Sequence, residues 1–362
     1  MRSISFVAFV LACGSRSQLD GAADASATVD AAIDASDVVV IPLNTPPSCQ
    51  GVGPGLSLCG VDADSCCTTL DVPGGTFFRT YGTDGKGNPI DPTDPATVSG
   101  FRLDKYMVTV ARFRLFAQAW ANGWRPAAGS GKHTHLNQGA GLANVADGGG
   151  FEPGWNPNDG AYVAPTDANL TCSQFPTWSG SFDAKRESLP INCVNWYEAA
   201  AFCNWDGGFL PSDAEWIFAA AGGDEQRVWP WGNDYKPGSV SQAKWAIYDC
   251  NIGPGPSYNK CSGATSATDL VARVGLTVNG RAKWGHFDLA GDVSEWTIDS
   301  MAFYRPCTDC AYLTNDGAIR TRHGGDYVNP IALIHPWYRL WEDPKNRGSL
   351  MGAFRCARSP AN

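Results

Sequence analysis

Three stretches of the chain repeat apolar residues at helical spacing, and together they outline its helices. In the first, Phe113, Phe116 and Trp120 would share one face of a helix that ends before Gly123. A side chain that can accept a hydrogen bond from the first helical amides precedes each stretch, namely Thr109, Asn195 and Ser212. The pattern therefore predicts helices over 110–120, 196–205 and 216–221.

Short apolar runs elsewhere predict strands, at 72–78, 101–108, 320–327 and 353–357. These runs do not alternate with the helices, so a doubly wound parallel sheet is not expected. Long segments rich in Gly, Asn and Pro show little periodicity and predict extended loops, at 123–188 and 233–283. The predicted fold class is α+β, with many loops and little regular secondary structure.

The N-terminus indicates export. Residues 1–12 contain Arg2 and an uncharged apolar run that is much shorter than the roughly 20 residues needed to span a bilayer. The run ends at Ala12 and Cys13, which resembles the lipobox of bacterial lipoproteins, so Cys13 is the expected lipidation site. Residues 13–40 are rich in Ala and Asp and predict a flexible tether. We expect an exported protein held by lipid at the bacterial cell envelope, in the outer membrane or at the cell surface. A soluble secreted protein is the alternative.

The cysteines fit an oxidising compartment. There are 13, and lipidation of Cys13 would leave an even number for disulfide bonds. Segment 41–71 holds four of them among Gly and Pro, which predicts a small disulfide-bonded cap before a main domain over 72–360. Zinc–thiolate sites are the alternative, but a single Cys-x-x-Cys pattern is weak evidence for one.

Charge excludes one class of partner. The chain contains 27 Lys and Arg against 36 Asp and Glu, a formal net charge of −9. Such a chain has no electrostatic means of holding a phosphate backbone, so nucleic acid is not expected as its main partner. The 41 Gly and 24 Pro agree with a loop-rich fold, and several of the 14 Trp could form a binding surface in the loops.

Seven segments in a fixed order carry a family resemblance. They are V-P-G-G-T-F at 72–77, L-D-K-Y-M-V-T at 103–109, L-P-I-N-C-V-N-W at 189–196, F-L-P-S-D-A-E-W at 209–216, W-P-W-G-N at 229–233, D-L-A-G-D-V-S-E-W at 288–296 and G-A-F-R-C at 352–356. In order and spacing they resemble the sulfatase-modifying factor family, whose founding activity is formylglycine generation. The resemblance implies the formylglycine-generating-enzyme-like variant of the C-type-lectin fold.

The resemblance also implies features that fasten the loops. It pairs Cys203 with Cys356, whereas two further disulfides are expected from proximity alone, Cys250–Cys261 and Cys307–Cys310. It further implies a structural Ca²⁺ held by side-chain and main-chain oxygens of Asp288, Gly291, Val293 and Glu295. The alternative is a surface loop in which the two carboxylates only cap and pair.

The metal centre of the catalytic relatives is not expected in this chain. In formylglycine-generating members two cysteines bind copper, and the resemblance places those positions at Asn329 and Ile334. An amide and an aliphatic side chain cannot replace two thiolates as ligands of Cu(I). Nearby positions depart from the family pattern as well, at Ser294, His323 and Asp326.

We therefore expect a binding or scaffold protein with no assigned catalytic residue. The polar residues expected near the former catalytic groove are His323, Asp326, Asn329, Arg339 and Ser294, and the expected ligand is an unidentified protein or glycan. The alternative is a metal-dependent oxidase of the same family that acts on cysteine or another thiol. Related enzymes bind iron through histidines, and His133 and His135 could present both rings to a metal from one side of a strand.

Overall fold

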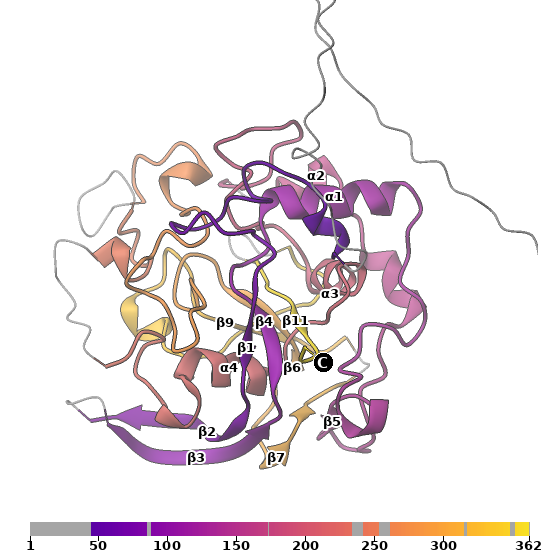
Figure 1. Cartoon of the computed structure of the whole chain (residues 1–362), viewed down its shortest axis with the longest axis vertical. Helices are drawn as coiled ribbons and strands as arrows, with labels where there is room; N and C mark the ends of the chain where they lie inside the picture. Colours follow the sequence, from indigo (N-terminus) through magenta and orange to yellow (C-terminus); the bar gives the residue numbers. More distant parts are fainter. Residues whose placement is uncertain are drawn as a thin grey trace, which may run out of the picture. The chain divides into compact units, whose positions relative to one another are not determined.

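The computed structural model describes residues 45–84, 88–172, 174–233, 242–252, 261–314, 317–347 and 352–361. These residues belong to one unit, Leu43–Asn362 (Figure 1). The expected signal at 1–12 and tether at 13–40, with Cys13, lie outside the described residues. Within the described ranges, no helix is long and apolar enough to cross a membrane.

The predicted helices are present with their predicted caps. The α-helices are α1 (Val110–Ala121), α2 (Asp167–Leu170), α3 (Trp196–Trp205) and α4 (Asp213–Ala221). Thr109 accepts a hydrogen bond from the Arg112 amide, and Ser212 forms a capping box with Glu215. Short 3₁₀ helices occupy Pro47–Cys49, Asn137–Gly139, Pro157–Tyr162, Gly223–Glu225, Gln242–Lys244, Ala267–Asp269 and Ile331–Leu333.

The strands form several small sheets rather than one large one. They are β1 (Thr69–Val72), β2 (Gly75–Thr83), β3 (Pro89–Val98), β4 (Phe101–Asp104), β5 (Ala143–Asn144), β6 (Glu295–Ser300), β7 (Cys307–Thr308), β8 (Cys310–Ala311), β9 (Arg320–His323), β10 (Leu340–Glu342) and β11 (Ala357–Arg358). Their orders are β1-β4-β11, β10-β9-β6, β2-β3-β7 and β5-β8. This arrangement confirms the α+β class without a doubly wound sheet.

Several strands are shorter than predicted. Beyond β4 and before β11, the chain leaves the ladder but still makes loop hydrogen bonds, such as Val108 N to the Phe354 carbonyl at 2.9 Å. The apolar runs at these positions reflect burial in the loop-rich core, because both Val108 and Phe354 are fully buried. The strand lengths predicted from continuous apolar runs were therefore too long at these positions.

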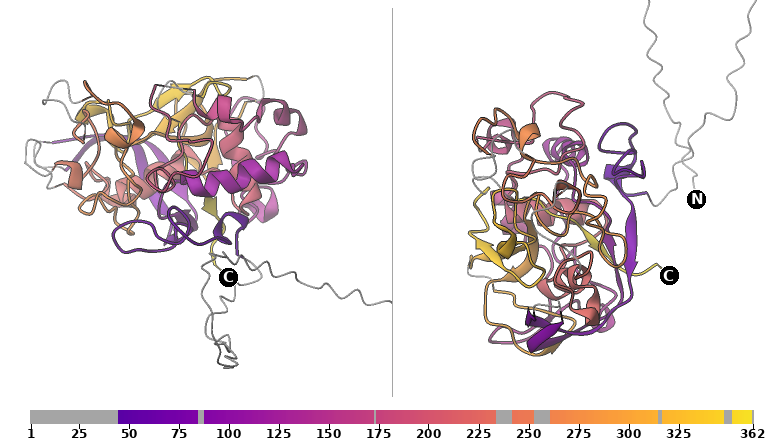
Figure 2. Two further views of the ribbon diagram at one scale, coloured as in Figure 1. Left: turned by 90° about the horizontal axis from the view of Figure 1, so that it is seen from above. Right: turned by 90° about the vertical axis from the view of Figure 1, so that its left-hand side faces the viewer.

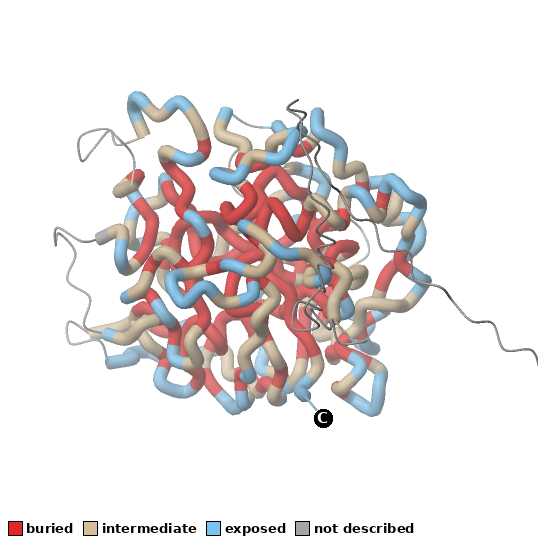
Figure 3. Tube along the Cα trace, turned by 45° about the horizontal axis from the view of Figure 1, so that its top comes forward, coloured by how far each residue is buried: buried red, intermediate tan, exposed pale blue. Residues whose placement is uncertain are grey.

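Aromatic side chains join α1 and α3 in the core, which is drawn in red in Figure 3. Phe113 stacks on Phe202 with ring centroids 5.9 Å apart, and Phe354 packs edge-on against both. The structure pairs Cys203 of α3 with Cys356 beside β11, as the family resemblance implied. The bond links segments 153 residues apart, so it restricts the unfolded chain strongly.

A ring of four charges is buried beside this core. Arg112 of α1 and Arg358 of β11 each contact both Asp104 and Asp206, at nitrogen–oxygen distances of 2.6–3.0 Å. All four side chains are almost completely buried. Each carboxylate meets two guanidinium groups, so the charges compensate one another locally.

The cysteine-rich segment packs on the rest of the unit. The Ser48 amide donates to Asp206 at 3.0 Å, and the Thr109 hydroxyl donates to the Gly55 carbonyl at 2.5 Å. Figure 2 shows the segment, in indigo, lying along α1. Its disulfides are Cys49–Cys67 and Cys59–Cys66, and those elsewhere, besides Cys203–Cys356, are Cys172–Cys193, Cys250–Cys261 and Cys307–Cys310.

Candidate functional site

Apolar side chains surround the second position at which the resemblance placed a copper cysteine. Ile334 is fully buried and packs in one cluster with Trp229, Tyr248 and Ala290. A Cβ atom on Gly325 would lie 2.7 Å from the Ile334 side chain, so the backbone approaches it closely. The position provides packing and offers no donor atom to a metal.

Asn329, at the other of these positions, takes part in a closed turn. The Asp326 carboxylate accepts hydrogen bonds from the amides of Val328 and Asn329, and the Asn329 side chain accepts one from the Asp326 amide. Burial raises the pKa of Asp326 to about 6. The polar atoms of this pair are used mainly to hold the turn.

His323 lies inside the molecule instead of in an open groove. Its Nε2 is 3.0 Å from the Asp213 carboxylate, and its ring stacks on Trp216 of α4. Burial alone would raise the pKa of Asp213, but His323 and Arg339 hold it well below its usual value. Burial and the nearby charge of Asp213 raise the pKa of Asp299 to about 8.

The five expected groove residues therefore separate into different places. His323 and Arg339 converge on Asp213, Asp326 and Asn329 close a turn, and Ser294 is fully buried just before β6. This corrects the expectation of one polar groove. The reason is that β6 and β9 pack against α4, which turns the side chains of Ser294 and His323 inward.

The segment expected to hold calcium contains two buried carboxylates with little compensating charge. Asp288 accepts hydrogen bonds from the Thr277 hydroxyl and the Gly275 amide, at 2.6 and 2.7 Å. Asp292 accepts one from the Ala272 amide, and its other oxygen, Oδ2, has no hydrogen-bond partner among the described residues. Burial raises the pKa of both groups, and Asp288 adds a like charge beside Asp292. These two carboxylates fit a hard cation.

Glu295, in contrast, already has a cation of its own. Its two oxygens lie 2.6 and 2.7 Å from Arg355 in a bidentate pair, and one also accepts a hydrogen bond from Trp216. The structure thus directs the Glu295 carboxylate toward Arg355. The second carboxylate that could bind a cation is Asp292. It was absent from the expected ligand set of Asp288, Gly291, Val293 and Glu295.

The two candidate iron-binding histidines also differ from expectation. Neither residue lies in a strand, since His133 is in a loop and His135 in a turn. His133 is fully buried between Glu152 and Glu215, at 2.9 and 3.1 Å. Burial alone would lower the pKa of His133, but the two carboxylates raise it to about 10. His133 is therefore a buried cation at neutral pH, which does not suit it as a metal ligand.

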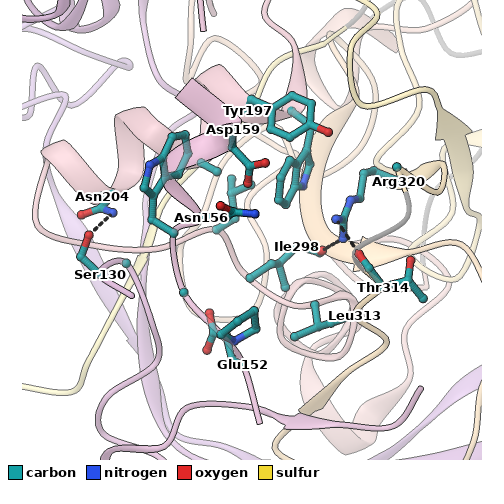
Figure 4. A pocket seen from close by; sticks show the side chains of 18 residues that line it. Ser130, Glu152, Asn156, Asp159, Tyr197, Asn204, Ile298, Leu313, Thr314 and Arg320 are labelled. Carbon is teal, nitrogen blue, oxygen red and sulfur yellow. Dashed lines mark hydrogen bonds between the residues drawn. The ribbon is translucent and has the colours of Figure 1, made fainter. Parts of the chain in front are cut away.

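A cavity of about 340 Å³ opens beside this buried histidine. Figure 4 shows Asp159 and Asn156 near the centre of the view, Glu152 below them and Arg320 to the right. Its aromatic walls are Trp155, Trp196 and Tyr197, and its apolar floor includes Leu210, Ile298 and Leu313. The volume falls within the range of small-molecule sites.

Glu152, one of the lining residues, is a buried carboxylate with only one of its two oxygens in use among the described residues. The side chain is only 2% exposed, and its Oε2 accepts from the amides of His133 and Leu142 and contacts the His133 ring. The other oxygen, Oε1, is buried and makes no hydrogen bond within the described part of the chain. A buried carboxylate oxygen without a donor is costly, and the hydrogen bonds and the His133 contact of Oε2 offset part of that cost.

The expected site residues do not line this cavity, and the sequence interpretation missed those that do. Eight of the 18 lining residues lie in segment 123–188, which was treated as a loop because it lacks periodicity, and the other ten follow it in the chain. Some tryptophans were expected to form a binding surface in the loops, and Trp155 of this segment is instead buried in the lining of the cavity. The sequence signal was present: Glu152 and Asp159 flank Trp155 within eight residues.

Comparisons with known proteins agree with this fold. A family model, the sulfatase-modifying factor enzyme 1-like domain, matches residues 59–360. The formylglycine-generating enzyme of Streptomyces coelicolor is 30% identical over 299 residues, which cover 79% of this chain and 87% of that protein. The inactive C-alpha-formylglycine-generating enzyme 2 of Mus musculus is 28% identical over 302 residues, covering 80% and 85%. The structure of PvdO from Pseudomonas aeruginosa matches with a TM-score of 0.50 and 19% identity, covering 86% of this chain and all of that one, which supports the fold alone.

Proposed function

The chain belongs to the sulfatase-modifying factor enzyme 1-like family, and from that premise we propose that it is an envelope lipoprotein that binds a ligand and does not oxidise thiols. The observation that carries the proposal is the packing of Ile334. This side chain lies in an aromatic cluster at a position where the catalytic members, by resemblance, have a copper-binding cysteine. Such a cluster offers Cu(I) none of the soft donors that it prefers.

The disulfide pattern supports the same conclusion. Six bonds pair every cysteine of the described residues, from Cys49–Cys67 to Cys203–Cys356. A cysteine in a disulfide provides no thiolate for a metal. Among the relatives, the mouse protein named inactive shows that the family includes members described as lacking the activity.

Anchoring to the envelope rests on the sequence. Residues 1–12 have the features of a signal segment, and Cys13 follows as in lipoproteins. Disulfides throughout the folded unit agree with an oxidising compartment outside the cytoplasm. The mass of the mature N-terminus tests this part of the proposal: a diacylated or triacylated Cys13 supports it, and an unmodified Cys13 contradicts it.

A structural calcium ion is part of the proposal, with a revised set of ligands. Asp288 and Asp292 are buried carboxylates with no ion pair among the described residues, whereas Glu295 is paired with Arg355. Calcium would supply the missing positive charge and fasten the surrounding loops. Removal of calcium by chelation should lower the melting temperature of the wild-type protein, and Asp292→Asn should abolish that response.

The test of the catalytic part uses oxygen uptake. The purified protein is reconstituted with copper and given a cysteine-containing peptide, beside the Streptomyces coelicolor enzyme as a positive reference. We expect no peptide-dependent oxygen consumption from this protein. Turnover with stoichiometric copper or iron would instead establish the alternative, a metal-dependent oxidase that acts on a thiol.

A further inference from the structure

We infer that the cavity lined by α3 and by the turn Asn156–Asp159 binds a neutral saccharide. The inference rests on the proposed binding function and names a ligand class for it. The cavity differs from the region of Asn329 and Ile334, neither of which lines it. Its ligand would be a free sugar or the end of a longer glycan chain, which share this chemistry.

The charges of the lining are directed to the protein, which argues against a charged ligand. Glu152, Asp159 and Arg320 are the charged side chains of the lining. The Glu152 side chain is 1% exposed and contacts protonated His133 at 2.9 Å, so it presents no charge to a ligand. Arg320 donates to two main-chain carbonyls, and its positive charge counteracts the rise that burial causes in the pKa of Asp159. The cavity therefore favours neither a cation nor an anion.

Asn156 and Asp159 provide a donor and an acceptor on one turn. The Asn156 Oδ1 accepts from the Asn158 amide at 3.1 Å, which leaves Nδ2 without a partner among the described residues. The Asp159 carboxylate accepts no hydrogen bond within the part of the chain that the structure describes. The Asp159 amide donates to the Asn156 carbonyl at 2.9 Å, and Figure 4 shows the two side chains beside each other. Two neighbouring sugar hydroxyls could donate to Asp159 and accept from Asn156.

Asn204 of α3 adds a further acceptor to the same cavity. Its Nδ2 donates to the Ser130 hydroxyl at 2.7 Å, and its Oδ1 has no partner in the described ranges (Figure 4). Hydroxyl groups donate and accept at once, whereas an ammonium group only donates and a carboxylate only accepts. The mixture of donors and acceptors in the lining therefore suits a ligand with several hydroxyls.

The apolar part of the lining suits the C–H face of a sugar ring. Trp155 lines the cavity and packs against no other aromatic ring of the described chain, whereas Trp196 already lies under the Arg320 guanidinium at 4.1 Å. Ile298 and Leu313 add aliphatic surface. A purely apolar ligand would leave the polar groups of the lining without partners, so an amphipathic ligand fits better.

Calorimetric titration of the purified protein with glucose, N-acetylglucosamine and maltose tests the inference, with agmatine as the charged comparison. We expect at least one of the sugars to bind at a single site, with a dissociation constant of about a millimolar or below. The affinity should not change with added salt, because the ligand carries no charge. Binding of agmatine alone, or of none of the four compounds, would overturn the inference.

The same titration distinguishes the two sources of a saccharide. Tighter binding of maltose than of glucose would indicate a glycan chain, and equal binding would indicate a single sugar ring. Both results support the inference.

Two variants of one residue locate the binding. Asp159→Ala should weaken binding of the sugar by about tenfold, because a hydrogen bond to a charged group is lost. Asp159→Asn keeps an accepting oxygen and should weaken binding by only about threefold. Both variants should keep the fold, since Asp159 is partly exposed. Asp147→Ala is the control, at a carboxylate that is 88% exposed and outside the cavity, and should leave the affinity unchanged.

The variants also separate the inference from the proposed function. Sugar binding that is unaffected by Asp159→Ala would overturn the assignment to this cavity. The oxygen-uptake assay described above does not depend on Asp159. A chain that neither consumes oxygen nor binds a sugar would therefore contradict the cavity assignment and leave the non-oxidase proposal standing.

Discussion

The surroundings of Ile334 and those of Glu152 differ in how completely their groups are matched. Around Ile334, apolar side chains meet apolar side chains, and the nearby Asp326 and Asn329 satisfy each other within a turn. Around Glu152, which lines the cavity, one carboxylate oxygen is buried and has no donor among the residues that the structure describes. The comparison teaches that Ile334, at a position that the resemblance linked to a copper cysteine, lies in apolar packing, whereas a polar group without a full set of partners lies at Glu152.

The largest expected effect on stability comes from creating a cavity in the apolar packing around Ile334. Ile334→Ala should lower the free energy of unfolding by about 2–5 kcal/mol, because it removes a fully buried side chain from a packed cluster. Chemical denaturation measures this loss. Ile319→Ala, at a side chain that is 41% exposed, is the control and should change little. An equally stable Ile334→Ala variant would show that the cluster is not tightly packed.

Replacing the Glu152 carboxylate by an amide should lower the free energy of unfolding by a smaller but still measurable amount. Glu152→Gln should lower the free energy of unfolding by about 1–3 kcal/mol, because protonated His133 loses one of its two buried anions. Denaturation at pH 7 measures the change. A stabilised variant would mean that burial of the Glu152 charge outweighs its pairing with His133.

The pH dependence of stability tests whether His133 is protonated between its two carboxylates. His133 has a folded pKa of about 10, above its unfolded value near 6.5, so its stabilising contribution is present below pH 6.5 and declines as the pH rises toward 10. The free energy of unfolding should therefore fall between pH 7 and pH 10. His133→Gln should remove part of this slope, whereas His135→Gln, two residues away with a lowered pKa, should retain it. Equal slopes in all three proteins would contradict a protonated His133.

The smallest effect on stability is expected for Asp326→Asn, which also replaces a carboxylate by an amide but lies near Ile334. Asp326→Asn retains an oxygen to accept from the amides of Val328 and Asn329 and removes a charge that burial disfavours. Stability at pH 4, where Asp326 is largely neutral in the folded protein, should change by less than about 0.5 kcal/mol. Because the folded pKa of Asp326 is about 6, the variant should gain on the wild type as the pH rises from 4 to 6. A loss comparable to that of Glu152→Gln would remove the contrast between the two regions.

The sequence predicted the parts of the fold that depend on local patterns. Thr109, Asn195 and Ser212 cap the helices as expected, because capping depends on residues only three positions apart. Ordered motifs gave the family and its Cys203–Cys356 bond. Strand ends were predicted too long, since buried loops of this fold are as apolar as its strands.

Long-range pairing explains what the sequence could not predict. Arg112 of α1 is completely buried because Asp104, Asp206 and Arg358 meet around it, two of them from distant parts of the chain. Likewise, nothing local to Glu295 indicates that Arg355 would take both of its oxygens. The cavity also depends on tertiary contacts, which bring segment 130–160 against β6 and β9.

The most direct test of the central claim is an equilibrium titration with Cu(I) against a chromogenic chelator, under reducing conditions mild enough to keep the disulfides intact. The account predicts that this protein takes no copper from the chelator, whereas the Streptomyces coelicolor enzyme takes copper under the same conditions. One Cu(I) held tightly per chain, and lost in Asn329→Ala, would contradict the account.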